Sequence, residues 1–214
     1  MDDTLLKQAR QLNLRNGGKH CVIPPIVLMT DDLRLPDPEP AIKALPADSM
    51  VVFRHYDHPE RAILGAKLRR LCRARGILFL VANDLSLTLK LDADGIHLPE
   101  YRIHQTPQIF AQIPQDLIRT SACHQVNTIH VLQQLPRVAR PDGVFISPIF
   151  PTQSHPGAAT LKQSDMLAMA RFLKEAKMPP IGLGGVTGGT AAKLRTSALA
   201  SLAGIGFSAS EIEA

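Results

Sequence analysis

Residues 143–157 read Gly143-Val144-Phe145-Ile146-Ser147-Pro148-Ile149-Phe150-Pro151-Thr152-Gln153-Ser154-His155-Pro156-Gly157. The first four residues form an apolar run that is typical of a buried strand, and the chain then changes abruptly to prolines, hydroxyl groups and a histidine. Each proline fixes φ and removes a backbone donor, so the second part can be neither a helix interior nor a central strand. The segment therefore predicts a buried strand that ends in a shaped loop.

The same order of apolar run and polar end recurs along the chain. Eight strands are predicted, over residues 25–31, 50–54, 77–84, 95–98, 117–122, 143–146, 180–185 and 202–208. Helix-like segments, such as residues 59–75 and 164–177, lie between most of them, and this alternation predicts a parallel sheet that is covered on both faces. A count of eight favours a closed (β/α)₈ TIM barrel. An open doubly wound sheet is the alternative if the short run at 95–98 is not a strand.

The ends of the chain complete the predicted organisation. Residues 4–16 have the apolar spacing of a helix and stop at Gly17-Gly18, so residues 1–24 are expected to form an N-terminal helical extension. The barrel domain is then expected over residues 25–214. Its last helix, over residues 209–214, is expected to be short, because the chain of 214 residues is near the lower size limit of this fold.

Composition favours one globular domain inside the cell. The chain is 45% hydrophobic, has no run of about 18 apolar residues, and begins with an acidic rather than a basic and apolar segment. We therefore expect no membrane span and no secretory signal, and a cytoplasmic location. The three cysteines, Cys21, Cys72 and Cys123, are widely spaced, which argues against a disulfide framework and a structural zinc site.

The charge balance allows an anionic ligand. The formal net charge is +5, with no Trp and only two Tyr to stack on bases. Much of the basic charge falls at helical spacing, in Lys67, Arg69, Arg70, Arg73 and Arg75. We interpret that run as a solvated helix face rather than a nucleic-acid surface, and we expect no nucleic-acid partner.

In a (β/α)₈ barrel the active site is built from the loops that follow the strands. The glycines after the seventh predicted strand, Gly184 and Gly185, would let backbone N–H groups approach a phosphate closely, and Ser208 after the eighth could add donors. Arg54 could hold a phosphate or form a structural ion pair. Asp84 is either the cap of a short helix or a ligand of Mg²⁺, which needs only one or two carboxylates beside a pyrophosphate. His97, inside a strand, is more typical of a hydrogen-bonded core residue.

Several of these runs, taken together, resemble a known family. They are residues 25–31, Asn83-Asp84, Ala93-Asp94-Gly95-Ile96-His97-Leu98, residues 147–152 and residues 181–186. In this order and spacing they resemble the superfamily of thiamine-phosphate synthases and thiazole tautomerases. The resemblance spans residues 25–209, and the family is a (β/α)₈ barrel.

The resemblance to the synthases implies a transferase of thiamine biosynthesis. Such an enzyme joins hydroxymethylpyrimidine pyrophosphate to thiazole phosphate, with Mg²⁺ as cofactor and release of pyrophosphate. Its partners would be these two small phosphorylated substrates, and a homo-oligomer is left open. The implied contacts are Arg54 and Asn83 to pyrophosphate, Asp84 to Mg²⁺, Thr152, Gln153, Ser154 and His155 to the thiazole phosphate, and Gly184, Gly185 and Ser208 as a phosphate clamp.

Departures from the synthase pattern favour the other branch. Tyr56 and His155 stand where the synthases have lysines, and the second Mg²⁺ carboxylate falls near Arg102, with Glu100 as the candidate replacement. The tautomerases need no metal and use a histidine at the end of the fifth strand, for which His124 is the catalytic candidate and Cys123 the competing assignment. A third hypothesis is a non-catalytic relative that still binds a phosphorylated ligand.

Overall fold

The computed structural model describes residues 1–18, 21–151 and 161–205, and its eight strands close into one parallel barrel in sequence order. The strands are β1 (Ile26–Met29), β2 (Ser49–Phe53), β3 (Leu78–Ala82), β4 (Gly95–Leu98), β5 (Ile118–Cys123), β6 (Gly143–Ile146), β7 (Pro180–Leu183) and β8 (Ser201–Gly204). Pairing of β1 with β8 closes the ring, with Ile26 opposite Leu202.

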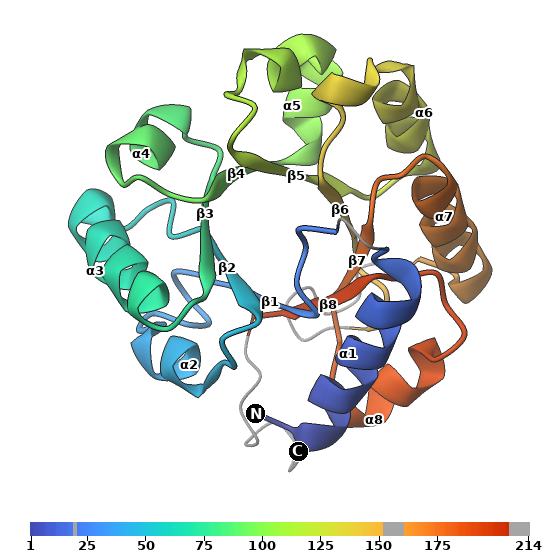
Figure 1. Ribbon diagram of the computed structural model, residues 1–214, viewed down its shortest axis with the longest axis horizontal. Coiled ribbons are helices and arrows are strands. Elements are labelled where there is room, and N and C mark those ends of the chain that lie inside the picture. Colours follow the sequence, from blue (N-terminus) through green and yellow to red (C-terminus); the bar gives the residue numbers. More distant parts are fainter. Residues whose placement is uncertain (19–20, 152–160, 206–214) are drawn as a thin grey trace.

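Helices surround the strands and leave the two ends of the barrel open to loops, as the view along the barrel in Figure 1 shows. The α-helices are α1 (Asp3–Asn16), α2 (Glu39–Ala44), α3 (Arg61–Ala74), α4 (Leu85–Lys90), α5 (Glu100–Gln105), α6 (Val126–Gln134), α7 (Gln163–Glu175) and α8 (Gly188–Ala191). Three 3₁₀ turns, η1 (Pro107–Gln112), η2 (Arg137–Ala139) and η3 (Ala192–Leu194), complete the described elements.

Alternate residues of each strand face opposite sides of the barrel wall. One buried cluster lies inside the barrel and includes Val27, Met29, Met50, Val52 and Phe145. Their neighbours in sequence belong to the larger cluster between the wall and the helices. Side chains alternate along a strand, so each polar residue that directly follows a strand faces either the barrel interior or the surrounding helices.

The predicted architecture is confirmed, including the short strand at residues 95–98, so the open sheet is wrong. The helix boundaries are less accurate. The helix predicted over residues 59–75 begins at Arg61 and ends at Ala74, and the one predicted over 164–177 begins one residue earlier, without a side-chain cap, and ends at Glu175. The predicted last helix, at 209–214, lies outside the described residues.

The helix α1 packs against the barrel at the ends where the strands begin. Its buried Leu5, Ala9 and Leu12 belong to the outer core. The side-chain amide of Asn13 donates to the carbonyls of Ile23 and Ala200, at 2.9 Å each, just before β1 and β8. These contacts attach the N-terminal helix to the barrel, while the division of the chain at residue 24 stays a prediction.

The predicted solvated face of α3 is wrong at one position. Arg69 is 8% exposed, and its guanidinium makes two hydrogen bonds, of 2.7 and 2.9 Å, to the carboxylate of Asp94. A carboxylate oxygen of Asp94 also accepts from the backbone N–H of Phe79 at 2.7 Å. The bidentate pair therefore ties α3 to the β3–β4 region, and spacing alone could not distinguish a buried arginine from its exposed neighbours.

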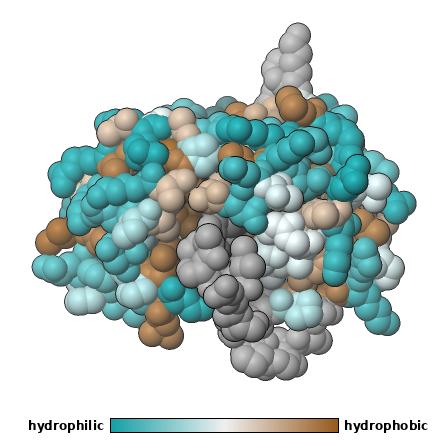
Figure 2. All heavy atoms as spheres, turned by 90° about the horizontal axis from the view of Figure 1, so that it is seen from below, coloured by the Kyte–Doolittle hydropathy of each residue, from teal (hydrophilic) through white to brown (hydrophobic). Residues whose placement is uncertain are grey.

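The outer surface is mixed in character. On the face drawn in Figure 2, hydrophilic residues surround separate hydrophobic ones. In the residues described, no helix is both long enough and apolar enough to cross a lipid bilayer.

Gly95 tests the packing at the start of β4. A Cβ on this residue would lie 2.1 Å from the backbone carbonyl oxygen of Ile118, which cannot move without disturbing the β4–β5 pairing. We expect Gly95→Ala to lower the free energy of unfolding by about 1–3 kcal/mol. Urea denaturation followed by circular dichroism measures the change.

The matched control is Gly189→Ala. A Cβ there meets only the Thr187 hydroxyl, at 3.9 Å, and the residue lies in α8, where alanine favours the helix. We expect no loss of stability from this variant. Equal destabilisation by the two substitutions would contradict the role of the Gly95 contact.

Candidate active site

A cavity of about 370 Å³ lies at the end of the barrel where the strands finish. Its apolar floor consists of Met29, Ala122, Phe145 and Leu183, which are the last inward-facing residues of their strands. The next inward positions on β2, β5 and β6 are Arg54, His124 and Ser147, which lie in its polar wall. Alternation along the strands therefore brings residues that are far apart in sequence to one apolar-floored cavity.

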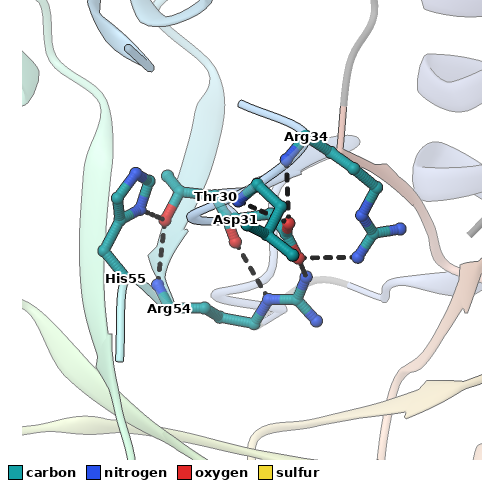
Figure 3. A network of polar contacts seen from close by, with 6 residues as sticks. Thr30, Asp31, Arg34, Arg54 and His55 are labelled. Carbon is teal, nitrogen blue, oxygen red and sulfur yellow. Dashed lines mark hydrogen bonds and ion pairs between the residues drawn. The ribbon is translucent and has the colours of Figure 1, made fainter. Parts of the chain in front are cut away.

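Arg54 lies in the cavity wall, where its side chain is 21% exposed and already paired. Its Nη2 donates to Asp31 Oδ2 at 2.9 Å, and its Nε donates to the Thr30 carbonyl at 3.0 Å. Figure 3 shows the Asp31 carboxylate between the guanidinium groups of Arg54 and Arg34. The sequence left two roles open for Arg54, a phosphate contact and a structural ion pair. The structure contains the ion pair, with Asp31.

The charges of this network shift the pKa values of its members. Burial would raise the pKa of Asp31, but the hydrogen bonds from Arg34 and the charges of Arg34 and Arg54 outweigh burial and lower it to about 2. Burial lowers the pKa of Arg54 from its ordinary value, against the opposing charge of Asp31. A guanidinium remains protonated at neutral pH in any case. The pair is therefore ionised, and Asp31 neutralises part of the charge that Arg54 brings to the cavity.

His124 is held by contacts of its backbone and its ring with two residues, Glu100 in α5 and Ser147 after β6. Its Nδ1 lies 2.9 Å from the carbonyl oxygen of Ser147, and its backbone N–H donates to Glu100 Oε1 at 2.8 Å. A carbonyl oxygen can only accept, so this geometry assigns the proton of the neutral ring to Nδ1. The other ring nitrogen, Nε2, then carries a lone pair on a residue that lines the cavity.

Cys123, the competing assignment, faces the other way. Its side chain is buried in the outer core, and its Sγ contacts the Gln125 carbonyl at 3.3 Å. Burial raises the pKa of this thiol to about 12, so it is not a ready thiolate. Of the two neighbours, His124 is the one that lines the cavity.

His97 forms part of the cavity floor and is a core residue, as its place within a strand indicated. It is 4% exposed, its Nδ1 lies 3.0 Å from Thr120 Oγ1, and its ring makes an edge-on contact with Phe145. Burial, together with the charges of Arg54 and His124, lowers the pKa of His97 to about 3. The imidazole is therefore neutral at physiological pH.

Asp84 is engaged on both carboxylate oxygens. Oδ1 accepts from the backbone N–H of Leu87 at 2.8 Å, which caps α4, and Oδ2 accepts from Arg61 Nη1 at 3.0 Å. Asn83 precedes it with φ of 57°, a conformation that asparagine tolerates, and its amide donates to the Tyr101 hydroxyl at 2.8 Å. The capping alternative for Asp84 is thus confirmed.

Both oxygens of Asp84 already have a partner, because one accepts from the N–H group of the helix cap and the other from a guanidinium cation. A Mg²⁺ ion would have to share these oxygens with a cation that repels it, and its binding at Asp84 stays a prediction. Glu100, the candidate replacement, accepts through Oε1 from His124 and from the Thr128 hydroxyl. Across residues 1–18, 21–151 and 161–205, no three His, Cys, Asp or Glu side chains lie together as a cation site.

The glycines after β7 lie against the loop that follows β6. Gly184 and Gly185 have positive φ values of 104° and 62°, and a Cβ on Gly185 would lie 2.5 Å from the carbonyl oxygen of Pro151. The backbone N–H of Phe150 donates to the Gly184 carbonyl at 3.2 Å. Close approach of two backbone segments therefore accounts for glycine at 185, and phosphate binding there stays a prediction. The predicted contacts Thr152, Gln153, Ser154, His155 and Ser208 lie outside the described residues.

Three residues near the cavity had no functional role in the sequence prediction. Tyr56 and Tyr101 line it, and they are the chain's two tyrosines. The guanidinium of Arg61 lies 5.6 Å from the ring centre of Tyr56 and pairs with Asp84. Arg61 begins α3 rather than following a strand, so the strand-end rule could not find it. For Tyr56 the available signal was its position where the synthases have a lysine, and for Tyr101 it was the scarcity of tyrosine.

The family described as thiamine monophosphate synthase matches residues 37–207, which is most of the chain. This protein belongs to that family. The expected family membership and (β/α)₈ barrel are thus confirmed.

Named relatives of the thiamine monophosphate synthase family agree with this membership. The thiamine-phosphate synthase of Geobacillus kaustophilus is 31% identical over 134 residues, which cover 62% of this chain and 57% of that protein. The thiamine-phosphate synthase of Bacillus mycoides is 26% identical over 181 residues, covering 80% and 72%. The match therefore spans little more than half of the first relative, and its activity is not transferred by the match alone.

The fold of this family member also matches solved structures. Thiamine phosphate pyrophosphorylase from Pyrococcus furiosus superposes with a TM-score of 0.60 at 19% identity, over 89% of this chain and 87% of that one. An HpcH/HpaI aldolase from Desulfitobacterium hafniense superposes with a TM-score of 0.58 at 13% identity, over 84% and 85%. At these identities the likeness concerns the fold.

His97 predicts a specific pH dependence of stability. Its pKa is about 3 when folded and 6.5 in an ordinary peptide, so the unfolded chain binds the extra proton between these values. The stabilisation is complete above pH 6.5 and is lost as pH falls toward 3, at up to about 1.4 kcal/mol per pH unit. Urea denaturation between pH 4.5 and 6.5 measures this slope, in a window above the titration of Asp31.

The comparison variant is His97→Gln, which removes the titrating group and keeps a hydrogen-bonding side chain. We expect a flatter dependence of the unfolding free energy on pH in this variant. Parallel slopes in the two proteins, or an NMR titration of the His97 ring above pH 5 in the folded protein, would contradict the burial argument.

Proposed function

We propose that this chain acts in thiamine biosynthesis as a metal-independent enzyme that moves a proton on a phosphorylated thiazole carboxylate. The observation that carries the proposal is the position of His124, whose Nδ1 faces the Ser147 carbonyl while the residue lines the cavity. Family membership supports the pathway. The engagement of Asp84 by Arg61 and a helix cap supports the metal-independent branch over the synthase.

The proposed step is a proton transfer within one molecule. His124 Nε2 accepts a proton from one position of the non-aromatic thiazole ring, and the resulting imidazolium returns it at a second position, so that the product is the aromatic isomer of the substrate. No oxidant, reductant or leaving group is needed. The Ser147 carbonyl stabilises the imidazolium through Nδ1–H, and the Glu100 carboxylate holds the His124 backbone.

The cavity suits a flat heteroaromatic ring with charged substituents. Its floor of Met29, Phe145 and Leu183 is apolar, and Tyr56 and Tyr101 provide aromatic wall. Arg54 is the cation in this wall and would face the substrate carboxylate while it keeps Asp31 as its own partner. We place the phosphate toward Gly184 and the loop after β6.

The second candidate is the thiamine-phosphate synthase reaction. It is favoured by the names of the relatives and by Arg54 in the cavity wall, where the family resemblance places a pyrophosphate contact. In that reaction the Asp84 carboxylate would hold Mg²⁺ beside the guanidinium of Arg61. The two candidates therefore differ in their dependence on Asp84 and on the metal.

His124→Asn tests the proton transfer. The asparagine amide can still donate to the Ser147 carbonyl, but it cannot take up a proton. We expect the rate of thiazole aromatisation, followed by ultraviolet absorbance, to fall by about 10²–10⁴-fold with an unchanged melting temperature. The control is His130→Asn on the exposed side of α6, which should keep full activity. An active His124→Asn enzyme would rule out this role.

Asp84→Asn tests the metal. Asparagine caps a helix about as well as aspartate, so only the ion pair with Arg61 is lost, at no more than about 1 kcal/mol. We expect the rate of aromatisation to change by less than about threefold in this variant, and in the unmodified enzyme when EDTA is added.

The unmodified enzyme and Asp84→Asn are also assayed with hydroxymethylpyrimidine pyrophosphate, thiazole phosphate and Mg²⁺. Formation of thiamine phosphate that collapses in Asp84→Asn would establish the synthase instead.

A further inference from the structure

A second cavity, of about 490 Å³, lies at the opposite end of the barrel. Its wall includes Pro141 and Asp142, just before β6, and Pro179, just before β7. The last turns of α1 and α7 complete it. It is therefore separated by the packed barrel interior from the cavity that holds His124.

This cavity concentrates positive charge. Among the residues that the structure describes, six cations and one carboxylate, Asp142, line it, which is an excess of five positive charges. The six cations are Arg15, Arg119, Arg137, Arg140, Lys174 and Lys177. Arg119 is ion-paired with Asp142, at 3.5 Å. Within the part of the chain that the structure describes, the other five have no carboxylate at ion-pair distance.

Some of these cations hold loops together through uncharged partners. The guanidinium of Arg140 donates to the carbonyls of Gln133, Leu135 and Ala176, and Lys174 Nζ donates to Asn16 Oδ1 at 2.9 Å. Carbonyl and amide groups satisfy donors but leave the charge uncompensated. These residues therefore build the wall and still contribute to the positive potential.

Others have donors to spare. Arg119 is 7% exposed, and its buried Nε has no hydrogen-bond partner among the described atoms beyond the long contact with Asp142. Arg137 and Lys177 are exposed at the rim of the cavity. Neither side chain donates a hydrogen bond to another residue within 1–18, 21–151 and 161–205. Exposed cations without carboxylate partners, beside a buried arginine, are the arrangement of a binding site for an anion.

We propose that this cavity is a second ligand site, which binds a small molecule carrying at least two phosphate groups. The clustered cations repel one another, and a bound polyanion offsets this repulsion because it attracts several of them at once. The volume of about 490 Å³ is on the order of fifteen water molecules, which exceeds the needs of a single phosphate ion. The site is independent of the proposed reaction, because it shares no residue with the cavity around His124.

The probe is inorganic pyrophosphate, with orthophosphate for comparison, measured by isothermal titration calorimetry on the full chain. We expect pyrophosphate to bind at least tenfold more tightly than orthophosphate and to weaken as sodium chloride is raised, because salt screens exposed charges. In the variant Arg137→Ala/Lys177→Gly we expect the dissociation constant for pyrophosphate to rise at least tenfold. Lys177 has φ of 62°, where glycine is favoured, so this variant should fold with an unchanged or higher melting temperature.

Two further variants locate the binding. Arg70→Ala/Lys90→Ala removes the same charge from exposed positions on α3 and α4 and should change the dissociation constant less than twofold. Arg54→Ala alters the other cavity and should leave this binding event in place. The proposal is overturned if Arg137→Ala/Lys177→Gly binds as the unmodified chain does. It is equally overturned if the Arg70 and Lys90 substitutions cause the same loss, or if Arg54→Ala abolishes binding. None of these outcomes depends on whether the chain turns over a thiazole.

Discussion

The closed parallel barrel imposes one constraint on which the rest of the structure depends, namely that every second residue of each strand faces inward. In β2 the inward row is Met50 and Val52, and the next inward position is Arg54. In β5 it continues through Ala122 to His124. A shift of one residue in either strand would bury the polar side chain among the helices and place Phe53 or Cys123 at the cavity.

The same constraint explains how much the sequence could predict. Eight apolar runs with polar ends were enough to predict the barrel and the end at which its cavity lies. The rule also selected Arg54 as a residue at a strand end, and Arg54 lines the cavity. It could not say whether the guanidinium is free, because its partner Asp31 follows a different strand, and pairing across strands depends on distances that a linear sequence does not contain.

Other errors arose where tertiary contacts override local spacing. Arg69 repeats the spacing of the exposed arginines around it, but the carboxylate of Asp94 draws it into a buried bidentate pair. Arg61 contributes to the cavity region from the start of a helix, through Tyr56 and Asp84. Neither residue has a motif of its own, because the carboxylate that pairs with each one is more than 20 positions away in the sequence.

The two ends of the barrel differ in how their charge is balanced, and this difference bears on the chemistry. Near the cavity of His124, the cations Arg34, Arg54 and Arg61 are each paired with Asp31 or Asp84. A departing pyrophosphate, which carries several negative charges, would have to share each of these three guanidinium groups with a carboxylate. A proton shift within one molecule makes no such demand, because no multiply charged group leaves. The paired cations thus support the proposed proton transfer at this end of the barrel, while, among the described residues, a group of cations without carboxylate partners lies at the other end.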